Sequence, residues 1–217
     1  EQPHNLLVIT GRFQPFHNDH LQLVQFALGR AARVVIGITN ADPAARQAHP
    51  TNAHRHLARA NPFSYEERKQ LIAAALAAAA IPASRYEIVA FPLDEPAAWP
   101  AIVPPGAAQI VRVFSDWERE KVRRFESAGY LTVVLEGDLA RRISATDIRQ
   151  ALAQDKPWQH WVPPGTRELL ANWRCAAVAT PILAVRSSRG VHHFPARRRR
   201  GVDGVAGHGA DDAARLP

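Results

Sequence analysis

The chain has one cysteine, Cys175, no methionine, and no apolar run long enough to cross a bilayer. A single thiol excludes an internal disulfide, which fits the reducing cytoplasm. Hydrophobic residues make up 47% of the sequence, as in a globular protein rather than in a disordered or membrane-embedded one. We therefore expect a cytoplasmic protein with no membrane partner, whose 217 residues can bury a sizeable core.

Acidic residues are few relative to basic ones, with 20 against 27 and a net charge of +7. From Arg186 to the end there are seven arginines and three acidic residues, so the preceding 185 residues carry only +3. We predict one domain over residues 1–181 and a basic, disordered tail over residues 182–217. A nucleic-acid partner is not expected, because most of the basic excess lies outside the predicted domain. The modest positive charge that remains suits a protein that binds phosphates.

Apolar runs alternate with amphipathic stretches along the predicted domain. The apolar runs predict strands at residues 6–10, 33–38, 86–91, 109–114 and 130–135. Helices are predicted at residues 18–30, 65–80, from 116 onwards, at 146–153 and at 165–173, with a short helix around Trp99. This alternation predicts an α/β fold, a Rossmann-like, open, parallel five-stranded sheet with helices on both faces.

The stretch between the first strand and the first helix carries the most distinctive chemistry. It reads Gly11-Arg12-Phe13-Gln14-Pro15-Phe16-His17-Asn18-Asp19-His20. A glycine turn from strand into helix is typical of phosphate sites in open α/β folds, because the free N–H groups of the helix start attract anions. Arg12 adds a planar donor fork, and His17 and His20 share one face of the first helical turn.

A second motif, Ile143-Ser144-Ala145-Thr146-Asp147-Ile148-Arg149, begins a later helix that Ser144 is expected to cap. Together the two stretches resemble the HxGH and ISxTxxR signatures of the nucleotidylyltransferase superfamily. The branch that they resemble most is the archaeal-type nicotinamide-nucleotide adenylyltransferases. The resemblance covers roughly residues 5–173.

The resemblance implies a site for a nucleoside triphosphate. Its nucleotide-binding residues would be Gly11, Arg12, Phe13, Gln14, His17, His20, Ser144, Thr146 and Arg149, of which Arg12, His17, His20 and Arg149 would be catalytic. In the family, a phosphate of the acceptor attacks the α-phosphorus in line and pyrophosphate leaves. No protein metal ligand is implied, because Mg²⁺ would be held mainly by phosphates and water.

For the acceptor, the resemblance points to Trp99, Arg68 and Asn40. Trp99 lies where the archaeal-type enzymes stack a tryptophan on nicotinamide, but a wedge in a loop core explains the residue equally well. Arg68 would meet the acceptor or a nucleotide phosphate.

Three departures from the family pattern bear on the substrate. Asp19 replaces the glycine of the first signature, which in the family lies close to the nucleobase. The insert at residues 44–61 is longer than the family loop and is either a lid using Arg55 and Arg59 or a plain loop. A metal site at His54 and His56 is disfavoured by their spacing. Finally, Ser115-Asp116-Trp117 replaces the usual Ser-Gly-Asn.

The sequence thus predicts a nucleotidylyltransferase that joins ATP to nicotinamide mononucleotide, in NAD biosynthesis. One alternative keeps the fold but uses CTP, or ATP with another phosphate or phosphonate acceptor. Another is a non-catalytic nucleotide sensor or RNA-binding protein. The resemblance also raises the expectation of a homo-oligomer, since the archaeal-type relatives form closed assemblies.

Overall fold

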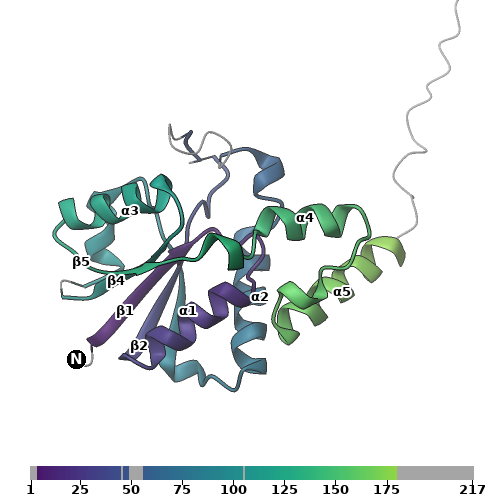
Figure 1. Ribbon diagram of the computed structural model, residues 1–217, viewed down its shortest axis with the longest axis horizontal. Helices are drawn as coiled ribbons and strands as arrows, with labels where there is room; N and C mark the ends of the chain where they lie inside the picture. Colours follow the sequence, from purple (N-terminus) through teal and green to yellow (C-terminus); the bar gives the residue numbers. More distant parts are fainter. Residues whose placement is uncertain (1–3, 45, 49–55, 105, 180–217) are drawn as a thin grey trace, which may run out of the picture. The chain divides into compact units, whose positions relative to one another are not determined.

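The computed structural model describes residues 4–44, 46–48, 56–104 and 106–179, with the side chains of residues 175–179 left aside. Five parallel strands form one sheet in the order β3-β2-β1-β4-β5 (Figure 1). They are β1 (His4–Gly11), β2 (Ala31–Ile38), β3 (Tyr86–Ala90), β4 (Ala108–Val113) and β5 (Leu131–Glu136). The predicted Rossmann-like α/β fold is confirmed. The predicted tail, most of the insert and the side chain of Cys175 lie outside the described residues.

Both faces of the sheet are covered. On one face, α1 (Asn18–Leu28) and α2 (Tyr65–Ala78) pack on side chains of β1 and β2 that include Leu7, Ile9 and Ile36. On the other face, α3 (Asp116–Ser127) and the 3-10 helix η3 (Pro96–Ala101) bury a second apolar cluster. The alternating sides of β1 explain why its run is apolar throughout: Leu7 and Ile9 face one layer and Val8 the other.

Two further helices pack outside α2. They are α4 (Ala145–Ala153) and α5 (Pro164–Ala179), whose cluster with α2 contains Leu71, Ile148 and Leu170. Gly165 permits the close approach of α5, because a Cβ there would lie 2.1 Å from the carbonyl oxygen of Ala74. The prediction that this helix ends near residue 173 is wrong, since the alanine-rich continuation extends it to Ala179.

Helix starts follow the capping signals in the sequence. Ser64 Oγ accepts from the backbone N–H of Glu67 at 3.2 Å, and Glu67 Oε2 accepts from the backbone N–H of Ser64 at 2.7 Å. Ser144 likewise accepts from the N–H of Asp147 at the start of α4. The predicted cap at Ser144 is confirmed, and it places a helix N-terminus in the functional region. No helix in the described part of the chain combines the length and apolar character that a membrane span needs.

Candidate active site

A cavity of about 210 Å³ lies at the carboxyl ends of β1, β2 and β4. Open parallel sheets bind their ligands at this edge. Eight of the predicted nucleotide-binding residues line it: Gly11, Arg12, Phe13, Gln14, His17, His20, Ser144 and Thr146. Residues more than 120 positions apart therefore meet in one cavity, as the two motifs predicted.

The two histidines stack at the start of α1. Their ring centroids are 3.6 Å apart with an interplanar angle of 25°. The backbone N–H of His17 donates to Nδ1 of His20 at 3.2 Å. Because Nδ1 is an acceptor here, a neutral His20 carries its proton on Nε2, which remains as the donor of the ring.

Both imidazoles are held neutral. Burial, followed by the charges of Arg142 and Arg112, lowers the pKa of His17 to about 3. Burial, followed by the charge of His17, also lowers the pKa of His20 well below its ordinary value. The rings of Phe13 and His20 pack edge to face with their centroids 4.9 Å apart, which explains part of the desolvation of His20. At neutral pH the motif therefore presents neutral N–H donors rather than two imidazolium ions.

The glycine turn is shaped by the aromatic residue that follows it. Phe13 has a φ of 51°, in the left-handed region that a bulky residue seldom adopts. A Cβ at Gly11 would lie 2.9 Å from the Phe13 ring, so glycine makes room for this conformation. The Gln14 amide, in turn, donates to the carbonyl of Phe63 at 2.8 Å and accepts from its N–H at 3.0 Å. The Gln14 side chain thus anchors the turn to the entry of α2.

The second motif contacts the first through Arg149. This residue does not line the cavity, but its Nη1 donates to the carbonyl of Gln14 at 2.7 Å and its Nη2 to Thr146 Oγ1 at 3.0 Å. Arg149 consequently fixes α4 to the glycine turn while Ser144 and Thr146 face the cavity. Burial lowers its pKa, which indicates a partly desolvated charge beside the site.

Arg68 does not line the cavity, and it is fully buried beneath the turns after β1 and β2, whose carbonyls it contacts. Its guanidinium donates to the carbonyls of Arg12, Thr39 and Asn40 at 3.0, 2.7 and 3.0 Å, and also to that of Ser64 at 3.1 Å. These bonds tie the turns after β1 and β2 together. The predicted acceptor contact of Arg68 stays a prediction, while the observed contacts are those of a residue that organises the backbone.

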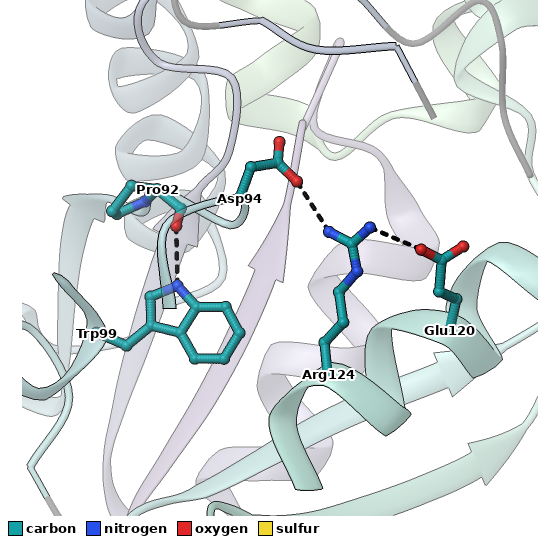
Figure 2. A network of polar contacts seen from close by, with 5 residues as sticks. All are labelled: Pro92, Asp94, Trp99, Glu120 and Arg124. Atoms are coloured by element: carbon teal, nitrogen blue, oxygen red, sulfur yellow. Dashed lines mark hydrogen bonds and ion pairs between the residues drawn. The ribbon is translucent and has the colours of Figure 1, made fainter. Parts of the chain in front are cut away.

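Trp99 lies in the apolar cluster on the face of the sheet that α3 and η3 cover, and it is fully buried. Figure 2 shows its Nε1 donating to the carbonyl of Pro92, at 2.8 Å. Its ring stacks on Phe91, with centroids 5.6 Å apart, and meets Phe125 at 5.0 Å. Of the two interpretations of Trp99, its placement matches the wedge in a loop core. Stacking on an acceptor would require the ring to leave this core.

The loop that carries Pro92 is also held by an ion-pair network (Figure 2). Arg124 on α3 donates to Asp94 Oδ1 at 2.9 Å and to Glu120 Oε1 at 2.6 Å. Beside this loop is a second cavity of about 290 Å³, lined by Asn40 and by residues of the loop after β3. Asn40, the third residue predicted for the acceptor, therefore lies at a neighbouring cavity, with Leu93 lining both.

Four charged residues of the cavity were missed by the sequence analysis: Arg112, Glu118, Lys121 and Arg142. Lys121 on α3 is buried and donates to the carbonyl of Thr10, at the end of β1. Arg142 lies over the Phe114 ring at 4.8 Å and 3.8 Å from Glu118. Arg112 lies within the apolar run of β4, and the other three belong to charged helix or loop segments, so no motif marked them. A signal for Lys121 was its place one turn before buried Phe125, on the same face of α3.

The insert reaches the site at its described ends. Arg12 Nη1 donates to the carbonyl of Ala60 at 3.2 Å. Burial and the charges of Arg149, Arg68 and Arg46 lower the pKa of Arg12 to about 10, so these guanidinium groups lie within electrostatic reach of one another. The predictions for His54 and Arg55 fall outside the described residues. The lid role of Arg59 stays a prediction.

The site is therefore a set of cationic and neutral donors around a cavity with two helix N-termini. Such a set binds phosphates and stabilises charge that develops on them. Within the described residues, no group of three His, Cys, Asp or Glu side chains is placed to hold a metal ion.

Comparison with known proteins agrees with this chemistry. A family profile described as "Cytidylyltransferase-like" matches residues 8–151. The phosphonoformate cytidylyltransferase of Streptomyces viridochromogenes is 34% identical over 163 residues, which cover 75% of this chain and 89% of that protein. The nicotinamide-nucleotide adenylyltransferase of Thermococcus kodakarensis is 29% identical over 164 residues, with coverage of 75% and 80%.

Among solved structures, a bifunctional NMN adenylyltransferase/ADP ribose pyrophosphatase from Francisella tularensis has a TM-score of 0.60 at 22% identity. The match covers 79% of this chain and 50% of that one, so the chain spans about half the length of the bifunctional protein. A second structure of that protein is a complex with AMP and a manganese ion. At this identity, the likeness shows a shared fold.

Proposed function

Because the chain belongs to the cytidylyltransferase-like family and is a nucleotidylyltransferase, we propose that it transfers a cytidylyl group from CTP to a small phosphonate or phosphate acceptor. An oxygen of the acceptor attacks the α-phosphorus in line. One P–O bond forms, the bond to the β-phosphate oxygen breaks, and pyrophosphate leaves with the electron pair. The attacking oxygen is already ionised near pH 7, so no general base is required.

The residues of the two motifs would act by positioning and by charge stabilisation. The neutral imidazoles of His17 and His20 would donate to phosphate oxygens that gain negative charge in the transition state. Arg12 would add its positive charge, and the start of α4 would supply free N–H groups together with Ser144 and Thr146. Arg149 would hold α4 in place, through its bond to Gln14.

The burial of Trp99 carries the choice of a small acceptor. The aromatic platform expected for nicotinamide is fully buried among Phe91, Phe125 and Tyr130. An acceptor without an aromatic ring makes no demand on it. The 34% identity to a cytidylyltransferase that acts on a small phosphonate supports the same choice.

Adenylyl transfer from ATP to nicotinamide mononucleotide is the second candidate. It is favoured by the motif pattern and by relatives of that activity, at 29% identity in one case. It would require Trp99 to become accessible or the nicotinamide ring to bind elsewhere, for instance beside Asn40 in the second cavity.

Magnesium is the proposed cofactor, with the cytoplasm as the place of action. The described residues contain no cluster of protein ligands, which fits an ion held mainly by phosphate oxygens and water. The ion would neutralise part of the charge of the triphosphate.

The test is pyrophosphate release by the full chain with Mg²⁺, pairing CTP or ATP with phosphonoformate or nicotinamide mononucleotide. We expect release with CTP and phosphonoformate, and little with the other pairs. Release only with ATP and the mononucleotide would establish the second candidate. Nucleotide binding without release from any pair would refute the enzymatic proposal and point to a nucleotide sensor.

A further inference from the structure

Asp19, the second residue of α1, joins the two motifs across the cavity. Its Oδ2 accepts a hydrogen bond from the backbone N–H of Ile143 at 2.8 Å, although 124 positions separate the two residues. Ile143 directly precedes Ser144, the N-cap of α4. A side chain of the first motif therefore holds the backbone at the entry to the second.

A second link joins the same two segments further along α4. Arg149, in the second turn of this helix, donates to the carbonyl of Gln14 at 2.7 Å. The body of α4 is already held by Ile148, which packs in the apolar cluster with α2 and α5. Two links, at the entry and one turn later, fix both the position and the direction of its N-terminus.

The surroundings of Asp19 make a carboxylate acceptable in a cavity built for anions. Asp19 lies in the first turn of α1, where the helix dipole favours negative charge. Its own carbonyl accepts from Arg112 Nη1 at 3.5 Å, and Arg142 lines the same cavity. One carboxylate oxygen is already occupied by a backbone donor. The helix start, the backbone donor and the nearby arginines therefore offset part of this negative charge before any phosphate arrives.

We propose that Asp19 is a positioning residue for nucleotidyl transfer. Its carboxylate seats the Ile143–Ser144 segment, so that the free N–H groups of α4 and the imidazoles of α1 face the same phosphate chain. Glycine, which the resembling family has at this position, has no side chain that could form the link. The proposal rests on the proposed function for the identity of the nucleotide, but the geometry it describes can be tested with phosphate alone.

The probe is inorganic tripolyphosphate, which has neither base nor acceptor, titrated calorimetrically into the full chain. Asp19→Ala removes the acceptor atom and should weaken binding about tenfold to a hundredfold, the scale of one hydrogen bond to a charged group. Asp19→Asn keeps an amide oxygen that can accept from Ile143, and its affinity should stay close to that of the wild type. Glu66→Ala is the control, because it removes an exposed first-turn carboxylate from α2.

Tighter tripolyphosphate binding by both Asp19 variants would overturn the proposal, since the carboxylate would then only repel anions. Unchanged binding by Asp19→Ala would overturn it as well. If Asp19→Ala does not fold, Asp19→Asn decides, because repulsion predicts tighter binding and seating predicts no change.

Turnover separates this proposal from the proposed function. With a productive substrate pair, Asp19→Ala should lower kcat/KM for the triphosphate and leave the acceptor KM unchanged, and Asp19→Asn should rescue it. If no pair releases pyrophosphate but tripolyphosphate follows the expected order, the proposed function fails and the positioning role stands. Normal turnover by Asp19→Ala would refute the positioning role alone.

Discussion

Acidification from pH 7.5 to 5.0 should destabilise this protein by about 2 kcal/mol through His17 alone. The pKa of His17 is lowered to about 3 by burial and by the charges of Arg142 and Arg112. The folded state therefore stays unprotonated at this residue throughout the range. The unfolded chain takes up a proton below its ordinary pKa of 6.5, so acid favours unfolding.

The magnitude follows from proton linkage. Above pH 6.5 neither state binds the proton and the full stability is present. Between pH 6.5 and the folded pKa, each pH unit costs about 1.36 kcal/mol, so the 1.5 units down to pH 5.0 cost about 2 kcal/mol. The pKa of His20 is lowered too, which acts in the same direction and makes the wild-type loss larger.

The assay is reversible urea unfolding, followed by circular dichroism at pH 7.5 and 5.0, for the wild type and His17→Asn. Asparagine keeps a polar side chain but does not titrate, while all other ionisable groups are shared by the two proteins. The wild type should lose about 2 kcal/mol more than the variant. An equal loss in both proteins would refute the conclusion that His17 is held neutral by its surroundings.

Three further substitutions test the site. Trp99→Ala should lower the free energy of unfolding by about 3–5 kcal/mol in urea titrations, as for other buried aromatic residues, and leave the acceptor KM unchanged. A large rise in the acceptor KM of a folded variant would instead place Trp99 in the acceptor site. His20→Ala should lower turnover at least about a hundredfold, because one donor to developing charge is lost. The control is His160→Ala, which removes an exposed histidine. Near-normal turnover of His20→Ala would remove His20 from the mechanism. Arg149→Lys should reduce turnover about tenfold or more, since a single ammonium cannot donate to both Gln14 and Thr146 as the guanidinium does. Full activity would contradict the role of Arg149 in positioning α4.

Local sequence patterns were enough to predict the strands of the sheet and the start of α4. The apolar runs located all five strands, and the cap at Ser144 was assigned correctly, because both signals act within a few residues. The motifs also identified which loops meet at the sheet edge, since the carboxyl ends of parallel strands share one edge. Eight predicted nucleotide-binding residues therefore line the cavity.

The features that the sequence did not predict depend on contacts between distant segments of the chain. Lys121 meets the carbonyl of Thr10 across 111 positions, and Asp19 meets Ile143 across 124. Neither local sequence indicates which distant backbone group the charged side chain contacts. Trp99 is the converse case: its sequence position resembles an acceptor platform, but its ring is drawn into the core by Phe91, Phe125 and a bond to Pro92.

The arginines of the site divide into those that build it and those that can meet the ligand, but their charges act together. Arg68 and Arg149 donate hydrogen bonds to backbone carbonyls. Arg68 thereby fixes the turns after β1 and β2, and Arg149 fixes α4. Burial, followed by the charges of Arg149, Arg68 and Arg46, lowers the pKa of Arg12 to about 10. Part of this shift comes from repulsion between the guanidinium groups in the ligand-free protein. A bound phosphate chain would relieve that repulsion, so arginines that touch no phosphate would still strengthen its binding.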